Sequence, residues 1–391
     1  MLNVGLVLSG GGARAGYQVG ALRALSELLG TTTTPFNILA GLSAGAINSM
    51  TLACFADDFP RAVAELHETW LSLEPHSVYR SDVRHLVSAG ARWIKDVTTG
   101  GVLGKSQANY LLDTQPLREL LSSRLDTSRI AGHLAAGILR GVTVSATSYA
   151  TGTIVSFFEG EPMAHPRQRS ARLSIREPLT VEHVMASAAI PLFFPPVSIK
   201  GRNFGDGGMR MTTPVSPAIH LGADKILAIG IRYRRTQEET VQLNRETSGS
   251  HVTVAQIAGV LLNALFLDSL DDDLARLQRI NRTLGFLSDD VRRNHPDSLR
   301  RIPSLLLSPS RDLGHLAADE YERFPRMLRH LLRGIGATGE SGWDLMSYLA
   351  FQPAYIGKLI ELGYRDTLER RADIEAFFAE PADDLSASPP R

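Results

Sequence analysis

Short apolar runs alternate with longer segments of helical spacing in the first part of the chain. Asn3 to Leu8 and Phe36 to Ala40 are almost wholly apolar, and each is followed by a turn that contains glycine. Runs of this length predict buried strands, and apolar residues at helical spacing predict helices at Tyr17 to Leu29 and Ala46 to Phe55. The repeated strand-turn-helix order predicts an α/β fold with a mostly parallel sheet covered by helices on both faces.

Both kinds of pattern continue toward the C-terminus. Further strands are predicted at Gly141 to Ala146, Thr153 to Phe158, Val197 to Gly201, Lys225 to Ile231 and Ser304 to Leu307. Helices are predicted at Arg61 to Leu73, Asp82 to Ile94, Pro116 to Leu125, Val181 to Ala188, Val254 to Leu270 and Asp273 to Leu284. Polar composition predicts a surface loop at Arg167 to Arg176 and a mobile linker at Arg234 to Ser250.

The order of these elements favours one elaborated domain. We expect a main domain over residues 1–316, with helical insertions at about 60–133 and 251–300. A helical C-terminal extension is expected over residues 317–380, and the composition of residues 381–391 predicts a disordered tail.

Composition and charge exclude several classes of protein. The 41 basic and 41 acidic residues balance, so the chain lacks the electrostatic footprint of a nucleic-acid binder. The single cysteine, Cys54, excludes an internal disulfide framework and is expected to be a small buried hydrophobe. The N-terminus lacks a secretory signal pattern, and the run from Val254 to Leu267 is too short and too polar to span a bilayer. We therefore expect a cytoplasmic protein whose membrane contact, if any, is peripheral.

Three successive glycines follow the first predicted strand. Gly10, Gly11 and Gly12 expose backbone amides at the start of a helix, which is a cradle for negative charge. The spacing also fits a dinucleotide fingerprint, but the second strand does not end in the carboxylate that would hold a ribose. The Gly-Lys-Ser/Thr of a Walker loop is also missing, so a nucleotide is the less favoured ligand.

Two polar residues stand on turns rich in glycine. Ser43 lies in Gly41-Leu42-Ser43-Ala44-Gly45, between a predicted strand and a predicted helix, where a sharp turn presents a nucleophile. In a chain with 34 glycines the same pattern also arises as an ordinary small-residue turn. Asp206 lies in Phe204-Gly205-Asp206-Gly207-Gly208, and alone it would be interpreted as a turn former.

These motifs occur in the order found in a known family. From Val4 to about Gly230 the chain resembles bacterial patatin-like phospholipases, in four blocks: Ser9 to Arg14, Gly41 to Gly45, Ala186 to Pro191, and Asp206 to Gly208. A departure from the family pattern is Ala15, where many members carry glycine. The resemblance implies a three-layer α/β/α fold with helical insertions and a helical C-terminal region.

The resemblance also implies a serine-aspartate dyad. Ser43 would be the nucleophile and Asp206 its base, and the chain would act on fatty-acyl esters of phospholipids or lysophospholipids. The oxyanion hole would come from the turn Gly10-Gly11-Gly12-Ala13-Arg14, with motif support from Gly41, Gly45, Gly207 and Gly208. For Arg14 two roles stay open: its side chain adds positive charge near the oxyanion, or it is solvated or structural.

Other arrangements and functions stay open from the sequence. A serine-acid-histidine triad would draw on His220, His251, His295, His315 or His330. The α/β-hydrolase fold that carries such a triad sets several strands before its serine, whereas Ser43 follows only the second predicted strand. We expect no cofactor and no metal, since Asp271-Asp272-Asp273 lacks the glycine and glutamate of a calcium loop. The alternatives are a carboxylesterase or thioesterase on soluble acyl groups or a polyester, and a lipid-binding protein with little turnover.

Two helical segments are candidates for lipid contact. Asp82 to Val97 mixes basic, apolar and aromatic residues in a pattern that fits either a membrane interface or a helix packed on the sheet. We also expect the helical region from Pro60 to His133 to form one wall of an acyl-chain groove.

Overall fold

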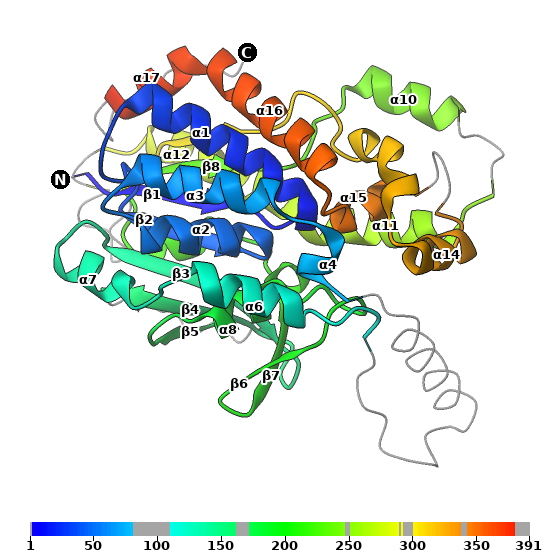
Figure 1. Cartoon of the computed structure of the whole chain (residues 1–391). Helices are drawn as coiled ribbons and strands as arrows, with labels where there is room; N and C mark the ends of the chain where they lie inside the picture. Colours follow the sequence, from blue (N-terminus) through cyan, green and yellow to red (C-terminus); the bar gives the residue numbers. More distant parts are fainter. Residues whose placement is uncertain are drawn as a thin grey trace.

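A computed structural model describes residues 2–80, 110–161, 172–246, 251–288, 291, 300–337 and 342–379. Its centre is a mixed, mostly parallel sheet in the strand order β5-β4-β3-β2-β1-β8-β9 (Figure 1). The strands are β1 (Val4–Leu8), β2 (Ile38–Leu42), β3 (Gly141–Ser148), β4 (Ile154–Gly160), β5 (Arg172–Arg176), β6 (Val197–Ile199), β7 (Arg202–Asp206), β8 (Lys225–Ile229) and β9 (Ser304–Leu307). The predicted α/β fold with a mostly parallel sheet is confirmed.

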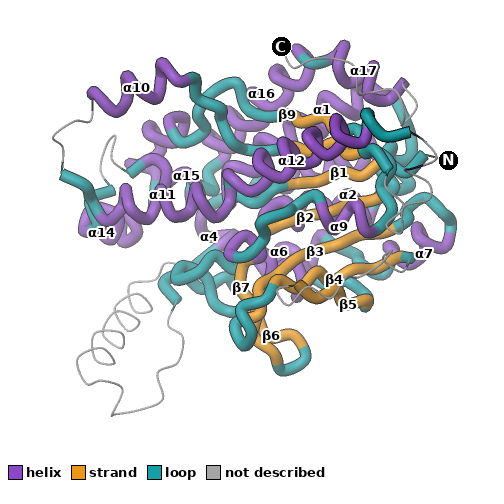
Figure 2. The backbone as a smooth tube through the Cα atoms, turned by 180° about the vertical axis from the view of Figure 1, so that it is seen from behind, coloured by secondary structure: helices purple, strands orange, loops and turns teal. Residues whose placement is uncertain are grey.

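Helices cover both faces of the sheet (Figures 1 and 2). The first part of the chain contributes η1 (Gly12–Ala15), α1 (Gly16–Leu29), α2 (Ala44–Cys54), α3 (Phe59–Leu71), α4 (Pro75–Val78), α6 (Gln115–Arg124), α7 (Arg129–Ala135), α8 (Val181–Ser187), η2 (Gly207–Met209) and α9 (Ser216–His220). The second part contributes α10 (Gln237–Glu246), α11 (Val254–Phe266), α12 (Asp268–Leu284), η3 (His315–Arg323), α14 (Arg326–Gly334), α15 (Trp343–Leu349), α16 (Pro353–Glu369) and α17 (Arg371–Ala379).

The central strand β1 shows how the layers are joined. All five of its residues are buried, because neighbouring strands and helices enclose it on every side. Leu6 and Leu8 point into the larger hydrophobic core with α1 and α2, whereas Val7 points into a second core with α9 and α12. The alternation of side chains along one strand therefore supplies both cores of the three-layer structure.

The C-terminal helix α16 packs directly along α1 (Figure 1). A Cβ atom on Gly20 would lie 1.9 Å from the carbonyl oxygen of Ile360, and one on Gly363 would lie 2.0 Å from that of Tyr17. The two backbones thus approach as closely as glycine allows. The expected boundary at residues 316 and 317 falls inside η3, and the division into a main domain and an extension stays a prediction.

Two predictions for polar segments are wrong. Residues 237–246 of the expected mobile linker form the helix α10, and residues 172–176 of the expected surface loop form β5, which pairs parallel with β4. Helix α10 begins with a capping box, because the Thr236 hydroxyl accepts from the Glu239 N–H and the Glu239 carboxylate accepts from the Thr236 N–H. The predicted helix at 82–94 and the amphipathic segment 82–97 lie outside the described residues.

One helical stretch of the described chain, Val254–Leu284, is long and apolar enough to cross a membrane by length and composition. The expectation from the sequence concerns Val254 to Leu267 alone, whereas the stretch that passes this test is the longer one formed by α11 and α12 together. This is weak evidence for a span, since the core helices of globular proteins pass the same test. Of the residues in the most apolar part of this stretch, 33% are buried inside the fold.

Strand register brings the two predicted site residues to the same place. Leu42, the last residue of β2, pairs with Ser145 of β3, and the next residue of β3, Ala146, pairs with Asp206 at the end of β7. Ser43 follows Leu42 directly. The ends of β2 and β7 therefore meet beside the same two residues of β3.

Candidate active site

Ser43 stands on a strained turn between β2 and α2. Its backbone has a φ of 53°, which is rare for a residue with a side chain and is tolerated where the surrounding structure enforces it. The turn is tight because a Cβ atom on Gly45 would lie 2.3 Å from the Leu8 carbonyl oxygen, and one on Gly41 would lie 2.1 Å from Ser49 Oγ. Glycine at both positions is therefore required for the backbone to make this turn.

A second serine fixes the backbone of this turn. The Ser43 N–H donates to Ser187 Oγ at 2.9 Å, and the Ser187 hydroxyl donates to the carbonyl oxygen of Ser145 at 2.7 Å. Ser187 is fully buried at the end of α8, so both bonds are sheltered from water. In the sequence Ser187 stands out only as a member of the Ala186 to Pro191 block, and no local pattern predicts this role for it.

Asp206 is fixed at the end of β7 by its own backbone. Its N–H donates to the carbonyl oxygen of Ala189 at 3.0 Å, and its carbonyl oxygen accepts from Thr147 Oγ1 at 2.8 Å. A Cβ atom on Gly207 would lie 2.3 Å from the carbonyl oxygen of Ser145, so the chain after Asp206 can pass this close to β3 only as glycine.

The two side chains are in direct contact. Ser43 Oγ donates to Asp206 Oδ2 at 2.7 Å, and the N–H of Gly208 donates to Asp206 Oδ1 at 2.8 Å. Burial raises the pKa of Asp206 from 3.8 to about 7, although the hydrogen bonds from Ser43 and Gly208 act in the opposite direction. A carboxyl group with this pKa accepts a proton far more readily than an exposed aspartate does.

The glycine turn lies next to Ser43. A Cβ atom on Gly10 would lie 2.7 Å from Ser43 Cβ, so the two segments touch through their backbones. Gly11 and Gly12 have φ angles of 152° and 56°. Within the described chain, neither of their N–H groups donates a hydrogen bond. Two unpaired donors beside a serine hydroxyl make an arrangement that can bind an oxyanion.

Arg14 takes the structural role. Its Nε donates to Ser347 Oγ at 2.8 Å, its Nη1 donates to Asn263 Oδ1 at 3.1 Å, and its Nη2 pairs with Asp344 Oδ1 at 2.8 Å. The guanidinium also lies over the ring of Tyr348, 4.3 Å from its centroid. The side chain is bonded to α11 and α15, and its own backbone N–H donates to the Gly11 carbonyl oxygen. Arg14 therefore anchors the glycine turn to the C-terminal part of the fold.

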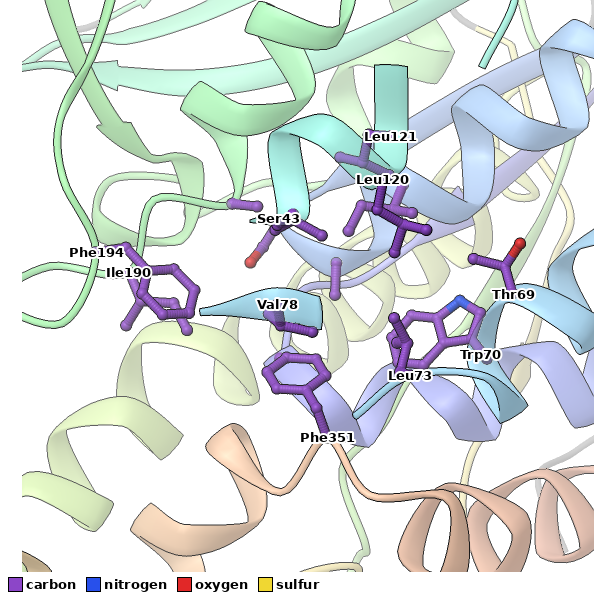
Figure 3. Close-up of a pocket in the computed structure, with 15 residues that line it drawn as sticks. Ser43, Thr69, Trp70, Leu73, Val78, Leu120, Leu121, Ile190, Phe194 and Phe351 are labelled. Carbon is purple, nitrogen blue, oxygen red and sulfur yellow. The ribbon is translucent and has the colours of Figure 1, made fainter. Parts of the chain in front are cut away.

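An apolar pocket opens from Ser43 (Figure 3). Its walls come from α2, from residues 69–78 and from α6, and it is closed by residues near the ends of α8 and α15. The lining residues are Gly12, Ser43, Ala44, Ile47, Thr69, Trp70, Leu73, Val78, Leu117, Leu120, Leu121, Ala188, Ile190, Phe194 and Phe351. Residues from the described part of the helical region 60–133 line this pocket, and the role of that region as a wall of an acyl-chain groove stays a prediction.

Sequence comparison assigns the chain to a family. The model of the patatin-like phospholipase family matches residues 6–219, which is more than half of the chain and includes Ser43 and Asp206. The chain belongs to the patatin-like phospholipase family. The members of this family are lipid acyl hydrolases, which act on lipid substrates. No curated protein sequence matches the chain.

Solved structures with similarity to this family member include three from different organisms. VipD from Legionella pneumophila is 13% identical with a TM-score of 0.34, over 95% of this chain and 67% of the other. Human GIVD cytosolic phospholipase A2, in complex with methyl gamma-linolenyl fluorophosphonate, is 13% identical with a TM-score of 0.43, over 99% and 60%. ExoU from Pseudomonas aeruginosa, in complex with SpcU, is 15% identical with a TM-score of 0.25, over 89% and 70%. Similarity at this level carries no argument about activity, and this chain spans about three fifths of the human protein.

The patatin-like motifs converge on one place in the structure. Ser43, Asp206 and the amides of Gly11 and Gly12 lie together, and Ala13 is buried in η1 directly after them. The Ser43–Asp206 hydrogen bond is direct, so no histidine bridges the two residues as a triad would require. Among the triad candidates, His315 stacks on Trp343, His251 and His330 are exposed, and His295 lies outside the described residues.

Proposed function

We propose that this patatin-like protein is a serine acyl hydrolase that cleaves fatty-acyl esters of phospholipids or lysophospholipids through Ser43 and Asp206. The observation that carries the proposal is the 2.7 Å hydrogen bond from Ser43 Oγ to Asp206 Oδ2, beside two unpaired amides and an apolar pocket. Family membership supports a lipid hydrolase, and the contact between these two residues supports the assignment of their roles.

Acylation begins at the ester carbonyl carbon. Asp206 takes the hydroxyl proton as Ser43 Oγ attacks, and the negative charge that develops on the carbonyl oxygen is bound by the Gly11 and Gly12 amides. When the tetrahedral intermediate collapses, the protonated Asp206 returns its proton to the leaving alcohol. The products of this half-reaction are the free alcohol and an acyl group on Ser43.

Deacylation repeats the same steps with water. Asp206 takes a proton from a water molecule, which attacks the acyl carbonyl, and the proton then returns to Ser43 as the fatty acid leaves. One carboxylate serves both half-reactions, so each needs its ionised form at the start. The raised pKa of Asp206, about 7, brings this base closer to neutrality than an ordinary aspartate.

The pocket supports a long apolar acyl group. Apart from Gly12, Ser43 and Thr69, its lining consists of apolar and aromatic side chains, so little in it can bind water or a polar substituent. Burial of each methylene group of a chain is worth about 0.8 kcal/mol, so each methylene group that enters the pocket is expected to tighten binding of the ester. This preference supports lipid substrates over small soluble esters.

A fluorophosphonate probe tests the proposal. The wild-type protein is expected to become labelled and to release fatty acid from phospholipid or lysophospholipid, and Ser43→Ala is expected to lose both. Asp206→Asn should slow both reactions by about a thousandfold, because the amide cannot take the serine proton. Ser123→Ala, at an exposed serine of α6, is the matched control and should be labelled normally.

Three outcomes would contradict parts of the proposal. A wild-type protein that does not react with the probe is not a serine hydrolase. Turnover restricted to short soluble esters would make the protein a carboxylesterase. Nearly full activity in Asp206→Asn would remove Asp206 as the base.

A further inference from the structure

Helix α11 carries an apolar face that is open to solvent. Val254, Ile257, Val260 and Leu261 expose 62%, 53%, 64% and 59% of their surface, at the spacing of one helical face. The opposite face of α11 packs into the main hydrophobic core through Ala255, Gly259, Leu262 and Phe266. The sequence from Val252 to Leu267 has no Asp, Glu, Lys or Arg, so nothing charged interrupts the exposed face. We call these four exposed residues the α11 outer face.

A basic helix lies beside the start of α11. The N–H of Ala255 donates to the Ile335 carbonyl oxygen at 3.0 Å, which ties α11 to the residue that follows α14, and both views place the two helices side by side (Figures 1 and 2). Helix α14 has no acidic residue, and its exposed side includes Arg326, His330 and Arg333. An exposed apolar surface is thus flanked by cationic side chains.

Acidic residues near this region are paired with arginines. Asp344, beside Gly259 of α11, pairs with Arg14. Glu322, which precedes α14, pairs with Arg329. Asp268 and Asp271 follow the helix, and they are paired with Arg232 and Arg234. Their charge is therefore largely compensated within the fold. Within the described part of the chain, the exposed Arg326 and Arg333 of α14 therefore leave positive charge near the start of α11.

We propose that the α11 outer face and the basic side of α14 together dock the protein on an anionic phospholipid surface. Apolar side chains enter the boundary between head groups and acyl chains, and adjacent arginines attract anionic head groups, which is the pattern of an interfacial helix. The combination of uninterrupted apolar residues with flanking positive charge fits this surface better than a second copy of the chain, which would bring like charges together.

The docking helix also reaches the candidate active site. Phe266, the last residue of α11, packs against both glycine turns of the site. A Cβ atom on Gly208 would lie 2.6 Å from the Phe266 ring, and a Cβ atom on Gly10 would lie 3.2 Å from it. A lipid surface bound by the outer face is therefore connected through one helix to the two turns that border Ser43 and Asp206. The inference deepens the proposed function, on which it rests only for the nature of the substrate.

Vesicle co-sedimentation tests docking without relying on turnover. With Ser43→Ala as the background, vesicles of phosphatidylglycerol and phosphatidylcholine are expected to bind the protein, and pure phosphatidylcholine vesicles to bind it more weakly. Adding Ile257→Asp with Leu261→Asp should weaken binding to both kinds of vesicle by about tenfold or more. Adding Arg326→Gln with Arg333→Gln should weaken binding to the anionic vesicles by about thirtyfold, because each arginine near the surface is worth about 1 kcal/mol.

The control is Val241→Asp, at an apolar residue of α10 that is 42% exposed, which should leave binding unchanged. Thermal unfolding of each variant separates loss of docking from loss of fold. A protein that binds neither kind of vesicle, or that binds equally well after Ile257→Asp with Leu261→Asp, overturns the proposal. A lipid-independent dimer that the same substitutions dissociate, measured by analytical ultracentrifugation, would assign the face to a second copy instead. All docking measurements use the Ser43→Ala background, which should not hydrolyse lipid. A loss of docking is therefore measured independently of any loss of hydrolysis.

Discussion

The guanidinium of Arg14 is paired with the carboxylate of Asp344 at 2.8 Å, across 330 residues of sequence. Through this pair the glycine turn beside Ser43 is held by α15, in the C-terminal part of the chain. A Cβ atom on Gly12 would also lie 2.3 Å from the Tyr348 carbonyl oxygen, so the backbone of α15 is in contact with the same turn. Residues well beyond the family match therefore position the proposed oxyanion hole.

Arg14→Gln is expected to destabilise the fold by about 3 kcal/mol, because it removes a buried guanidinium that bonds to Asn263, Asp344 and Ser347. Activity should fall mainly through kcat rather than KM, since the turn that binds the oxyanion loses its anchor. Denaturant unfolding and steady-state kinetics measure the two effects. Arg23→Gln is the control: this exposed arginine pairs with Glu27 on α1, and its loss should cost less than about 1 kcal/mol. Equal effects of the two substitutions would contradict the anchoring role.

The pH dependence of activity should follow the ionisation of Asp206. Because burial raises the pKa of Asp206 to about 7, kcat/KM is expected to rise with pH through this region and to level off above it. An aspartate with an ordinary pKa would give a rate that is already constant above about pH 5. Hydrolysis of a soluble ester between pH 5 and 9 distinguishes the two. A profile without any change near neutrality would show that Asp206 is not the base or that its pKa is not raised.

The same carboxyl group links stability to pH. Its pKa is about 7 in the fold, against 3.8 for an unperturbed aspartate, so between these two pH values the folded state holds a proton that the unfolded state has lost. Stability therefore falls as pH rises from about 4 to 7, by as much as about 4 kcal/mol, and changes no further above this range. Asp206→Asn removes this dependence, so its free energy of unfolding should exceed that of the wild type at pH 8 and approach it at pH 4. A constant difference across this range would contradict burial of an ionised Asp206.

Gly12 and Gly30 offer a matched comparison of backbone strain and crowding. Both have a positive φ, 56° and 59°, but a Cβ atom on Gly12 would meet the Tyr348 carbonyl oxygen at 2.3 Å, whereas nothing lies within 4 Å of one on Gly30. Gly30→Ala should cost about 1 kcal/mol from strain alone. Gly12→Ala should cost several times as much and abolish fluorophosphonate labelling, because the turn must move away from α15. Similar losses of stability in both variants would show that crowding at Gly12 is relieved easily.

The apolar pocket should set the preferred acyl length. Leu120 lines it from α6 and is partly buried, so Leu120→Trp fills space that a chain would occupy. We expect the preference of kcat/KM to move toward shorter acyl groups, by about tenfold between the longest and shortest esters of a series. Leu120→Ala, which widens the pocket, is the companion variant and should not favour shorter chains. An unchanged chain-length profile in Leu120→Trp would mean that the acyl group binds elsewhere.

Elements that combine a short apolar run with a glycine turn were predictable from the sequence. The predicted strands at Asn3 to Leu8 and Phe36 to Ala40 match β1 and β2 within two residues, because buried parallel strands consist of apolar residues throughout. The predicted helix at Tyr17 to Leu29 matches α1 within one residue, since a left-handed glycine, Gly30, ends it. These elements position Ser43, whose turn was identified on its local pattern alone.

Other features depend on partners that are distant in sequence. The anchoring of Arg14 requires Asn263, Asp344 and Ser347, and no local pattern connects these residues to a turn near the N-terminus. The contact of Asp206 with Ser43 was expected from the family resemblance, because an aspartate between glycines is otherwise an ordinary turn. By contrast, α10 carries a local signal for the start of a helix, the Thr-x-x-Glu spacing of Thr236 and Glu239. The polar composition of this segment led instead to the prediction of a linker.

The hydrogen bond between Ser43 and Asp206 spans 163 residues of sequence. A ribosome therefore delivers the proposed nucleophile long before its base, and Asp344, the anchor of the proposed oxyanion turn, comes later still. Until then the Ser43 hydroxyl of a nascent chain has no base beside it. The proposed ability to cleave esters therefore requires translation at least as far as Asp344, and a nascent chain that stops short of this residue is expected to lack it.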